Sequence, residues 1–567
     1  MLDLLVDHLK QIYSQEDISI IQRELFSYIQ TLPQYQKKQK PNENWYEYAN
    51  FYVVYPDSFF GDKKPLENFL QHLSYIKNLG INAIHILPFL DSPMKDRGFD
   101  VQNYFRVRKE LGSITDIKKI KRQAKELGLH LFMDLVFNHV SNQHEWFVKA
   151  VNGDAFYRNY FIHTKEKPQF LRTFKKNAAV WAEYLYEGEK TSVSVAFPEF
   201  AGEIPHWIRG KDGYWYYHTY YPHQLDVDWK NPNIFLEFAK VLIFWTTVGF
   251  NFRVDAVPFI GKSAYKQTNV TNDFAHHLIS GMQYIAKEIN PECSFILETY
   301  EKLETVIEYF GRENLTGAQM LYGFHLCTHL WVGIIEKNTS YIWAELEKIQ
   351  HIPITSQWIQ FLRNHDELSL AYLDESLVKD VGSKLLPFGR SFREGYGVAG
   401  RTFSFLQKNE QRFYMAYLLL FSMPKGVLIP YGDELGKENI SDSALSSDEK
   451  IDARNINRGC ITEEEIASEK GKRIVTFLSG LLGKRQRLRE LLNTWPKKII
   501  DDNEIFAASY ETGNKKLIIF INLTDKKKII SFISSNLTVI TSVNTVNVTD
   551  KSIKLDGFAG VWLQTTY

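Results

Sequence analysis

The sequence predicts an α/β protein built around a (β/α)8 barrel of the TIM type, and three observations predict it. Eight short runs rich in apolar residues recur along the chain, and amphipathic helical patterns lie between them. The apolar residues in these runs are continuous and do not alternate, which indicates strands buried on both faces of a parallel sheet. The chain has 567 residues, of which 44% are hydrophobic and 24% charged, so it can hold several domains of ordinary globular composition.

Residues 1–48 precede the first run and are predicted to form an N-terminal helical segment. Apolar residues at helical spacing, interrupted by charges, occur throughout MLDLLVDHLKQIYSQEDISIIQREL. The polar stretch QKKQKPNEN, residues 36–44, predicts a linker to the next element. The segment lacks the basic start and unbroken apolar core of a signal peptide, so we expect a cytoplasmic protein.

The catalytic barrel is predicted over residues 49–140 and 233–495. Two of its helical stretches, LENFLQHLSYIKNLG and ITDIKKIKRQAKELG, end in Leu-Gly, which is a helix-stop signal. The strand-like runs are, in order, ANFYVVYP, INAIHILP, LHLFMDLVFNH, GFNFRVDAV, CSFILETY, TGAQMLYGF, WIQFLRNHD and GVLIPYGDE.

Two further regions complete the predicted organisation. Residues 141–232, between the third strand and the next helix, contain many aromatic residues and glycines but no strong helix pattern, and we expect an inserted subdomain. After the helix KRIVTFLSGLLGKRQRLRELL the pattern changes to strand-like segments such as KLIIFINLT and GVWLQTTY. Residues 496–567 are therefore predicted to form a C-terminal antiparallel β-domain.

Four of the predicted barrel strands end in acidic or imidazole side chains. The third ends at His139, the fourth at Asp255, the fifth at Glu298, and the seventh at His365 and Asp366. A single aspartate at a strand end is more often a turn former or helix cap, and a single histidine is more often structural. Because the C-terminal ends of barrel strands converge on one rim, four such endings together favour an active site there.

These endings belong to motifs that resemble glycoside hydrolase family 13, the α-amylase family. DLVFNH, FRVDAV, LETY and RNHD are similar to its four short conserved segments, in order and at suitable spacing. DRGFDVQNY, HQLDVDW and YGDELG are further matches. The resemblance covers roughly residues 49–567, and the ordered set is far more specific than any single motif.

The resemblance implies a role for each carboxylate. Asp255 would be the nucleophile, Glu298 the acid and base, and Asp366 a third essential carboxylate that binds sugar hydroxyls. Arg253, two residues before Asp255 on the same strand, would keep the nucleophile ionised, whereas Glu298 must stay protonated near neutral pH. A covalent glucosyl-aspartate intermediate retains the anomeric configuration and needs carboxyl groups roughly 5–5.5 Å apart.

The resemblance also implies residues that hold the sugar. His139 and His365 would donate hydrogen bonds to hydroxyls of the bound sugar. Phe99 stands where the family more often has tyrosine, and its ring keeps a face for stacking on the sugar.

One implied pair concerns the end of the substrate. In exo-acting relatives an aspartate at the position of Asp96 pairs with an arginine beyond the eighth strand and closes a pocket for one glucosyl unit. Arg454 is the candidate arginine here, and Arg458 is the alternative. This pair, and the segments DAVPFIGK and HQLDVDW, resemble α-glucosidases, amylosucrases and trehalose synthases more than endo-amylases.

The resemblance therefore implies a retaining α-glycoside hydrolase or α-glucosyltransferase acting on terminal α-glucosyl residues of small α-glucosides. One alternative is a sucrose-active transglucosylase or phosphorylase, or a maltose–trehalose isomerase, because the covalent intermediate can react with different acceptors. The other is a non-catalytic sugar-binding relative. Such relatives lose catalytic carboxylates and carry a membrane segment, whereas this chain keeps all three and has no apolar run long enough to cross a bilayer.

No cofactor, metal or macromolecular partner is predicted. The loop after the first strand, PDSFFGDKKPLENF, offers only Asp57 and Asp62 where a calcium loop needs several alternating acidic or amide residues, and Asn138 serves equally well as a loop-bonding amide. The chain contains neither a P-loop nor a dinucleotide fingerprint. Lys+Arg and Asp+Glu are 67 each, so charge favours no nucleic-acid or membrane partner, and the expected partner is a small carbohydrate. The sequence leaves the oligomeric state open.

Overall fold

The computed structural model describes residues 3–32, 44–61, 63–177, 179–265, 273–312, 315–532 and 537–566. Its centre is a closed barrel of eight parallel strands, which confirms the predicted fold class. Seven strands lie within their predicted runs, and the strand of the seventh run begins one residue before it, at Gln357. Every strand residue except His130 is buried, which explains why these runs are largely apolar. The barrel strands are β1 (Asn50–Val54), β2 (Ala83–Ile86), β5 (His130–Leu135), β14 (Asn251–Val254), β15 (Phe295–Leu297), β18 (Met320–Tyr322), β19 (Gln357–Gln360) and β23 (Gly426–Pro430).

Helices surround the barrel, and local sequence sets their ends. Ser113 forms a capping box with Asp116 at the start of α5 (Ile114–Glu126). Asn231 caps α8 (Pro232–Val248), and Gly249 ends that helix with a φ of 105°. The other long helices are α9 (Asp273–Ile289), α11 (Phe324–Glu336), α12 (Ser340–Ile349), α13 (Glu375–Leu385), α15 (Glu410–Phe421) and α17 (Glu469–Arg487).

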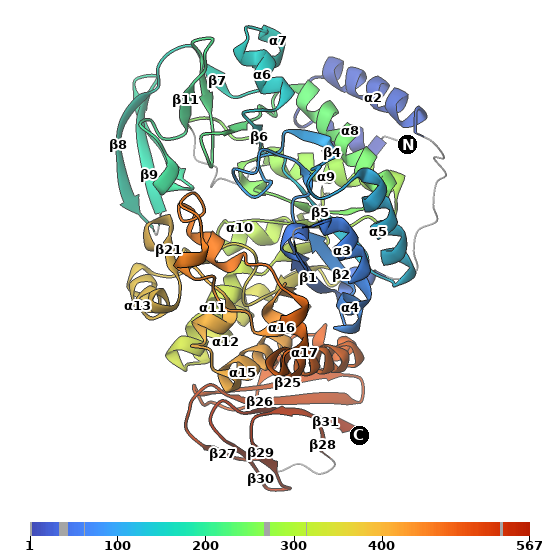
Figure 1. Ribbon diagram of the computed structural model, residues 1–567, viewed down its shortest axis with the longest axis vertical. Coiled ribbons are helices and arrows are strands. Elements are labelled where there is room, and N and C mark those ends of the chain that lie inside the picture. The colour runs from blue at the N-terminus through green and yellow to red at the C-terminus, as the bar shows by residue number, and fades with distance from the viewer. Residues whose placement is uncertain are drawn as a thin grey trace.

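The N-terminal segment contains two helices that pack on the outside of the barrel helices. Helix α1 (Asp3–Leu9) contacts α9 and α2 (Gln15–Gln30) contacts α8, where Figure 1 shows α2 lying beside it. Between them, the Tyr13 hydroxyl donates a 2.7 Å hydrogen bond to the backbone oxygen of Trp229. The predicted linker at 36–44 lies outside the described residues, except for Asn44.

The inserted region projects from the barrel rim between β5 and α8. It has two short helices, α6 (Glu145–Val151) and α7 (Ala155–Arg158), although the sequence shows no strong helix pattern there. Its main sheet is antiparallel, formed by β8 (Gln169–Lys176), β9 (Ala179–Tyr186) and β10 (Glu189–Val195), and lies at the upper left of Figure 1. Strands β6 (His139–Ser141) and β13 (Gln224–Asp226) pair with each other and join the two ends of the insert at the rim.

The C-terminal region is a separate pair of antiparallel sheets beyond α17, at the bottom of Figure 1. The five-stranded sheet includes β25 (Ile505–Thr512), β26 (Lys515–Asn522) and β31 (Gly560–Thr566). It is anchored to the end of α15 at Ser422, whose hydroxyl accepts a 2.7 Å hydrogen bond from the Trp562 indole and whose backbone oxygen accepts a 2.6 Å bond from Tyr510.

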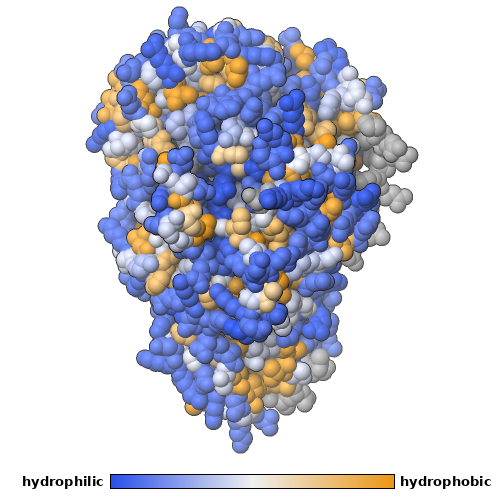
Figure 2. All heavy atoms as spheres, viewed as in Figure 1, coloured by the Kyte–Doolittle hydropathy of each residue, from blue (hydrophilic) through white to orange (hydrophobic). Residues whose placement is uncertain are grey.

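Hydrophilic residues cover most of the face seen in Figure 2, and apolar residues occur there as scattered groups. Among the residues that the structure describes, no helix combines the length and apolar character that crossing a bilayer requires. Strand ends, rather than a large apolar patch, are therefore the place to look for function.

Candidate active site

The fourth and fifth barrel strands bring Asp255 and Glu298 to the same level of one rim. Strands β14 and β15 pair in parallel, with Val254 opposite Leu297. The pairing continues past the strand ends, because the amide of Glu298 donates to the oxygen of Val254 at 3.1 Å. The next residue on β14 is Asp255, so the two carboxylates leave adjacent strands side by side.

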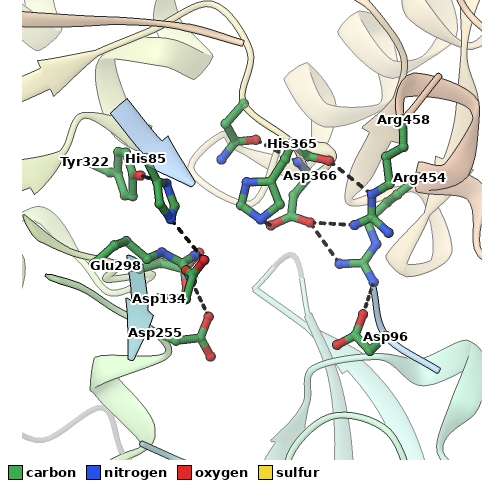
Figure 3. A network of polar contacts seen from close by, with 12 residues as sticks. His85, Asp96, Asp134, Asp255, Glu298, Tyr322, His365, Asp366, Arg454 and Arg458 are labelled. Atoms are coloured by element: carbon green, nitrogen blue, oxygen red, sulfur yellow. Dashed lines mark hydrogen bonds and ion pairs between the residues drawn. The ribbon is translucent and has the colours of Figure 1, made fainter. Parts of the chain in front are cut away.

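A single guanidinium, that of Arg253, joins three buried carboxylates. Its Nη1 donates to Asp134 Oδ1 at 2.9 Å and also to Asp255, while its Nη2 donates to Glu298 Oε1. Figure 3 shows these carboxylates grouped together. Arg253 is 1% exposed, Glu298 2% and Asp255 7%. The carboxylates at the ends of β5, β14 and β15 are therefore held together by one cation.

Sharing the guanidinium affects the protonation of Asp255. Burial raises the pKa of Asp255 well above its ordinary value, Arg253 opposes this, and the Glu298 carboxylate raises it further. From the sequence we expect Arg253 to keep Asp255 ionised, but its single charge is divided among three acids. Arg253 therefore only partly offsets the effect of burial on the pKa of Asp255.

Asp134 has a second partner, His85, in addition to Arg253. Its Oδ2 lies 3.0 Å from His85 Nε2, and the other nitrogen of His85 lies 3.1 Å from the Tyr322 hydroxyl. Burial would raise the pKa of Asp134, but His85 and Arg253 lower it below its ordinary value. Asp134 is therefore ionised beside Arg253.

Asp366 lies opposite this cluster, on the loop after β19, as Figure 3 shows. Its Oδ1 accepts from Arg454 Nη1 at 3.1 Å and from Arg458 Nη2 at 3.0 Å, and its Oδ2 lies 3.1 Å from His365 Nε2. Burial would raise the pKa of Asp366, but His365, Arg454 and Arg458 lower it well below its ordinary value. Asp366 is thus ionised, and its charge is directed into the space that Asp255 and Glu298 also face.

The pair predicted at the end of the site is present. Arg454 Nη2 lies 3.3 Å from Asp96 Oδ1, and Gln224 donates to the other oxygen of Asp96 at 2.8 Å. Burial raises the pKa of Asp96 to about 6, and the arginines oppose this shift. Arg458, the alternative partner, contacts Asp366 instead. Arg454 therefore connects Asp96 to Asp366.

Phe99 contacts both the Arg253 cluster and His365, the neighbour of Asp366. Its ring stacks on His365 with a centroid distance of 5.6 Å and an interplanar angle of 11°, and the Arg253 guanidinium lies 5.6 Å from the same ring. His139 Nε2 lies 3.2 Å from the backbone oxygen of Phe99, and its Nδ1 lies 3.2 Å from Asn138. Burial lowers the pKa of His139 to about 4, so this imidazole is neutral.

The groups considered for calcium have protein cations as partners. The buried Lys262 ammonium lies 2.6 Å from Asn138 Oδ1 and 2.5 Å from Asp226 Oδ2. Asp57 accepts a 2.6 Å hydrogen bond from Arg108, and Asp62 lies outside the described residues. Within the described part of the chain, no cluster of three or more His, Cys, Asp and Glu side chains could hold a metal ion.

Several residues of this site do not follow from the motifs alone. Asp134 and Lys262 lie inside the quoted motifs, but their charged partners are distant in sequence. Gln224 lies in HQLDVDW, and Asp452, which bonds Arg454 Nη2 at 2.9 Å, lies in DARNINRG. Tyr300, whose hydroxyl donates to Glu298 Oε1, is the last residue of LETY and has no signal beyond that position.

Comparison with known proteins identifies relatives over most of the chain. The family described as "Alpha amylase, catalytic domain" matches residues 52–375, more than half of the chain. A trehalose synthase/amylase from Mycolicibacterium smegmatis is 26% identical over 424 residues, which cover 73% of this chain and 66% of that protein. A trehalose synthase from Thermus thermophilus is 27% identical over 406 residues, which cover 69% of this chain and 38% of that protein. The chain thus spans about two thirds or less of the length of these relatives.

Solved structures show the same fold. The crystal structure of trehalose-6-phosphate hydrolase from Bacillus licheniformis superimposes with a TM-score of 0.68 at 18% sequence identity. The superposition covers 93% of this chain and all of the other.

Replacing Arg253 by methionine tests whether the guanidinium holds the carboxylates. We expect the free energy of unfolding to fall by about 3–5 kcal/mol at pH 7.5, because three acids lose their shared partner. The loss should be smaller at pH 5. Removing Arg253 raises the folded-state pKa of Asp255, which already lies above its ordinary value, and takes away one of the groups that lower the pKa of Asp134. Protonation of these acids therefore relieves part of the repulsion as the pH falls. Denaturant unfolding of the variant and the wild type at both pH values measures this difference in the free energy of unfolding.

Arg485→Met is the matched control, because buried Arg485 donates only to the backbone oxygens of Phe421, Met423 and Lys425. It should destabilise the protein by an amount that does not change between the two pH values. An Arg253→Met loss that is equally independent of pH would contradict the shared-carboxylate description.

Proposed function

Because the chain belongs to the α-amylase catalytic-domain family, we propose that it is a retaining α-glycosidase or α-glucosyltransferase that acts on terminal α-glucosyl residues of small α-glucosides. The observation that carries this proposal is the convergence of Asp255, Glu298 and Asp366 on one space at the barrel rim (Figure 3). Asp255 and Glu298 share the buried Arg253, whereas Asp366 is paired with Arg454 and Arg458.

In the proposed reaction, Asp255 attacks the anomeric carbon while Glu298 protonates the departing glycosidic oxygen. The C–O bond to the leaving group breaks as the bond to Asp255 forms, which gives a covalent glucosyl-aspartate. In the second step an acceptor molecule attacks the anomeric carbon and the bond to Asp255 breaks. Glu298, now ionised, removes the proton from that acceptor. Because one guanidinium contacts both carboxylates, the geometry supports the short separation of retaining enzymes, roughly 5 Å, over the wider spacing of inverting ones.

The electrostatics of the cluster fit this division of work. The oxocarbenium-like transition state gains positive charge, and the ionised Asp366 and Asp134 lie near it. In this reaction Glu298 must be protonated and Asp255 ionised when substrate is bound. Arg253 keeps a hydrogen bond to Asp255 for the charge that then remains there.

The ion pairs of Arg454 with Asp96 and Asp366 support action on a terminal glucosyl unit. Asp96, Arg454 and Asp366 form a continuous polar wall whose carboxylate oxygens can accept hydrogen bonds from sugar hydroxyls. Phe99 offers an apolar ring beside this wall for the apolar face of a sugar. An endo-acting enzyme would need an open groove at this position.

A second candidate is transfer of the glucosyl unit to a sugar, including isomerisation of a disaccharide, instead of hydrolysis. The insert contacts the turn between β21 (Arg390–Phe392) and β22 (Gly397–Ala399): the backbone amide of Glu394 donates to Glu199 at 2.6 Å, and Lys175 pairs with Glu394 at 2.7 Å. From the same two segments, the Phe197 and Phe392 rings lie 5.1 and 4.8 Å from the Arg454 guanidinium. We expect these contacts to restrict water near Arg454, and the trehalose synthases among the relatives support transfer.

Product analysis tests the proposal. We expect the protein to release or transfer glucose from at least one of maltose, sucrose and trehalose, supplied with and without phosphate. The first product seen by proton NMR should have the α configuration. Asp255→Asn should lower turnover by a factor of 10⁴ or more without unfolding the protein, a loss typical of a missing nucleophile (about 10⁴–10⁶).

The outcomes separate the alternatives. Release of both halves of the disaccharide as free monosaccharides indicates hydrolysis. Glucose 1-phosphate indicates phosphorolysis, and a new disaccharide or longer sugar indicates isomerisation or transfer. A β product formed first would exclude the retaining mechanism, and full activity in Asp255→Asn would remove that residue from the reaction. Binding of these sugars with no turnover by the wild type would favour the sugar-binding alternative.

We further propose that the fold and the reaction need neither calcium nor an organic cofactor. Lys262 supplies the positive charge between Asn138 and Asp226, and Arg108 does so at Asp57. EDTA should therefore leave both the thermal midpoint and the activity unchanged. Lys262→Met should lower the midpoint by several degrees, since about 3–5 kcal/mol is lost when one partner of a buried pair is removed. A midpoint that falls in EDTA and recovers with calcium would contradict this.

A further inference from the structure

Tyr300 contacts Glu298 but has no role in the site predicted from the sequence. It follows Glu298 by two residues at the C-terminal end of β15, and its hydroxyl donates a hydrogen bond to Glu298 Oε1. Its ring lies 5.0 Å from that of Phe324, the first residue of α11, and Phe324 packs edge-on against Phe361 at 5.3 Å. The hydroxyl is thus held in place by aromatic packing.

Glu298 has three hydrogen-bond donors. Arg253 and Tyr300 both donate to Oε1, and the backbone amide of Ala256 donates to Oε2 at 3.1 Å. Each of these bonds favours the ionised form of Glu298. In the proposed reaction, however, Glu298 must first be protonated, as the acid, and afterwards ionised, as the base.

The three donors differ in how they respond to that proton. A guanidinium and a backbone amide can only donate, whereas a hydroxyl can donate to a carboxylate or accept from a carboxylic acid. Tyr300 can therefore remain bonded to Glu298 in both states. Burial raises the pKa of Tyr300 well above its ordinary value, so the phenol keeps its proton throughout and remains a donor to the ionised form.

We propose that Tyr300 is a positioning residue for Glu298, whose hydroxyl orients the carboxyl group and stabilises the ionised form that develops as Glu298 gives its proton to the leaving oxygen. This inference rests on the proposed function, because it assigns Tyr300 a role only through Glu298. No proton leaves Tyr300: the proton delivered to the leaving oxygen comes from Glu298, and the proton that returns comes from the acceptor.

The test compares pH profiles of kcat/KM for the wild type and Tyr300→Phe. The basic limb reports loss of the proton that the Asp255–Glu298 pair must hold. Removing a donor to the ionised form raises the pKa of the pair, so the basic limb should move to higher pH by roughly one unit, as expected for one hydrogen bond to a charged group. A purely structural loss would lower the whole profile without moving its limb.

A second test compares kcat/KM on substrates whose leaving groups do and do not need a proton from Glu298. We expect Tyr300→Phe to lower kcat/KM about tenfold on the disaccharide that is turned over fastest. On α-D-glucosyl fluoride, whose fluoride departs without a proton, we expect a loss of about threefold or less. Tyr104→Phe is the matched control, because its buried hydroxyl donates to the backbone oxygen of Val136 at 2.7 Å and does not bond Glu298. Its basic limb should stay where it is in the wild type.

Glu298→Gln separates failure of this inference from failure of the proposed function. If that variant still turns over disaccharides, Glu298 is not the acid and the proposed function itself is wrong. If Glu298→Gln acts only on the fluoride, while folded Tyr300→Phe shows a basic limb within about 0.2 units of the wild type and equal losses on both substrates, then Tyr300 has no such role. A shifted limb with the larger loss on the disaccharide supports it.

Discussion

The contact of one buried guanidinium with three carboxylates is the constraint on which the rest of the site depends. Arg253 is almost fully buried, and an unpaired charge at such a position costs several kcal/mol. Its partners come from β5, β14 and β15, so these three strands must align in the observed register for the charge to be satisfied. Because the same contacts align Asp255 with Glu298, the interaction that the fold needs also prepares the chemistry.

The opposite half of the site is assembled differently. Asp366, Arg454 and Asp96 all lie outside the barrel strands. Asp96 and Asp366 are 270 positions apart in the chain. Ion pairs among them, and Gln224 from the end of the insert, hold these loops in place. The strand side can therefore stay rigid, while loop composition sets which sugar fits and which acceptor reaches the intermediate.

Much of this could be predicted from the sequence because burial leaves a direct mark on it. All eight barrel strands overlap largely apolar runs, since a strand covered on both faces cannot alternate. The ends of these runs located Asp255 and Glu298, and the family resemblance suggested the Asp96–Arg454 pair that the structure contains. The short helices α6 and α7 were not expected, because helices of seven and four residues have too little periodicity to detect.

The charge balance of the site could not be predicted in the same way. Whether Arg253 serves one acid or three depends on the register of β5 and β15 against β14. Likewise Lys262 is seven residues beyond Asp255 in the chain, yet its partners are Asn138 and Asp226 from the two ends of the insert. Pairings of this kind arise only when distant segments meet.

Trapping the covalent glucosyl-enzyme intermediate tests most directly whether Asp255 is the nucleophile. The protein would be incubated with 5-fluoro-α-D-glucosyl fluoride, digested at low pH and mapped by mass spectrometry. The account predicts one added 5-fluoroglucosyl group per chain, on the peptide that contains Asp255. Label on the peptide of Glu298 or Asp366, or turnover of the reagent with no labelled peptide in a rapid quench, would contradict it.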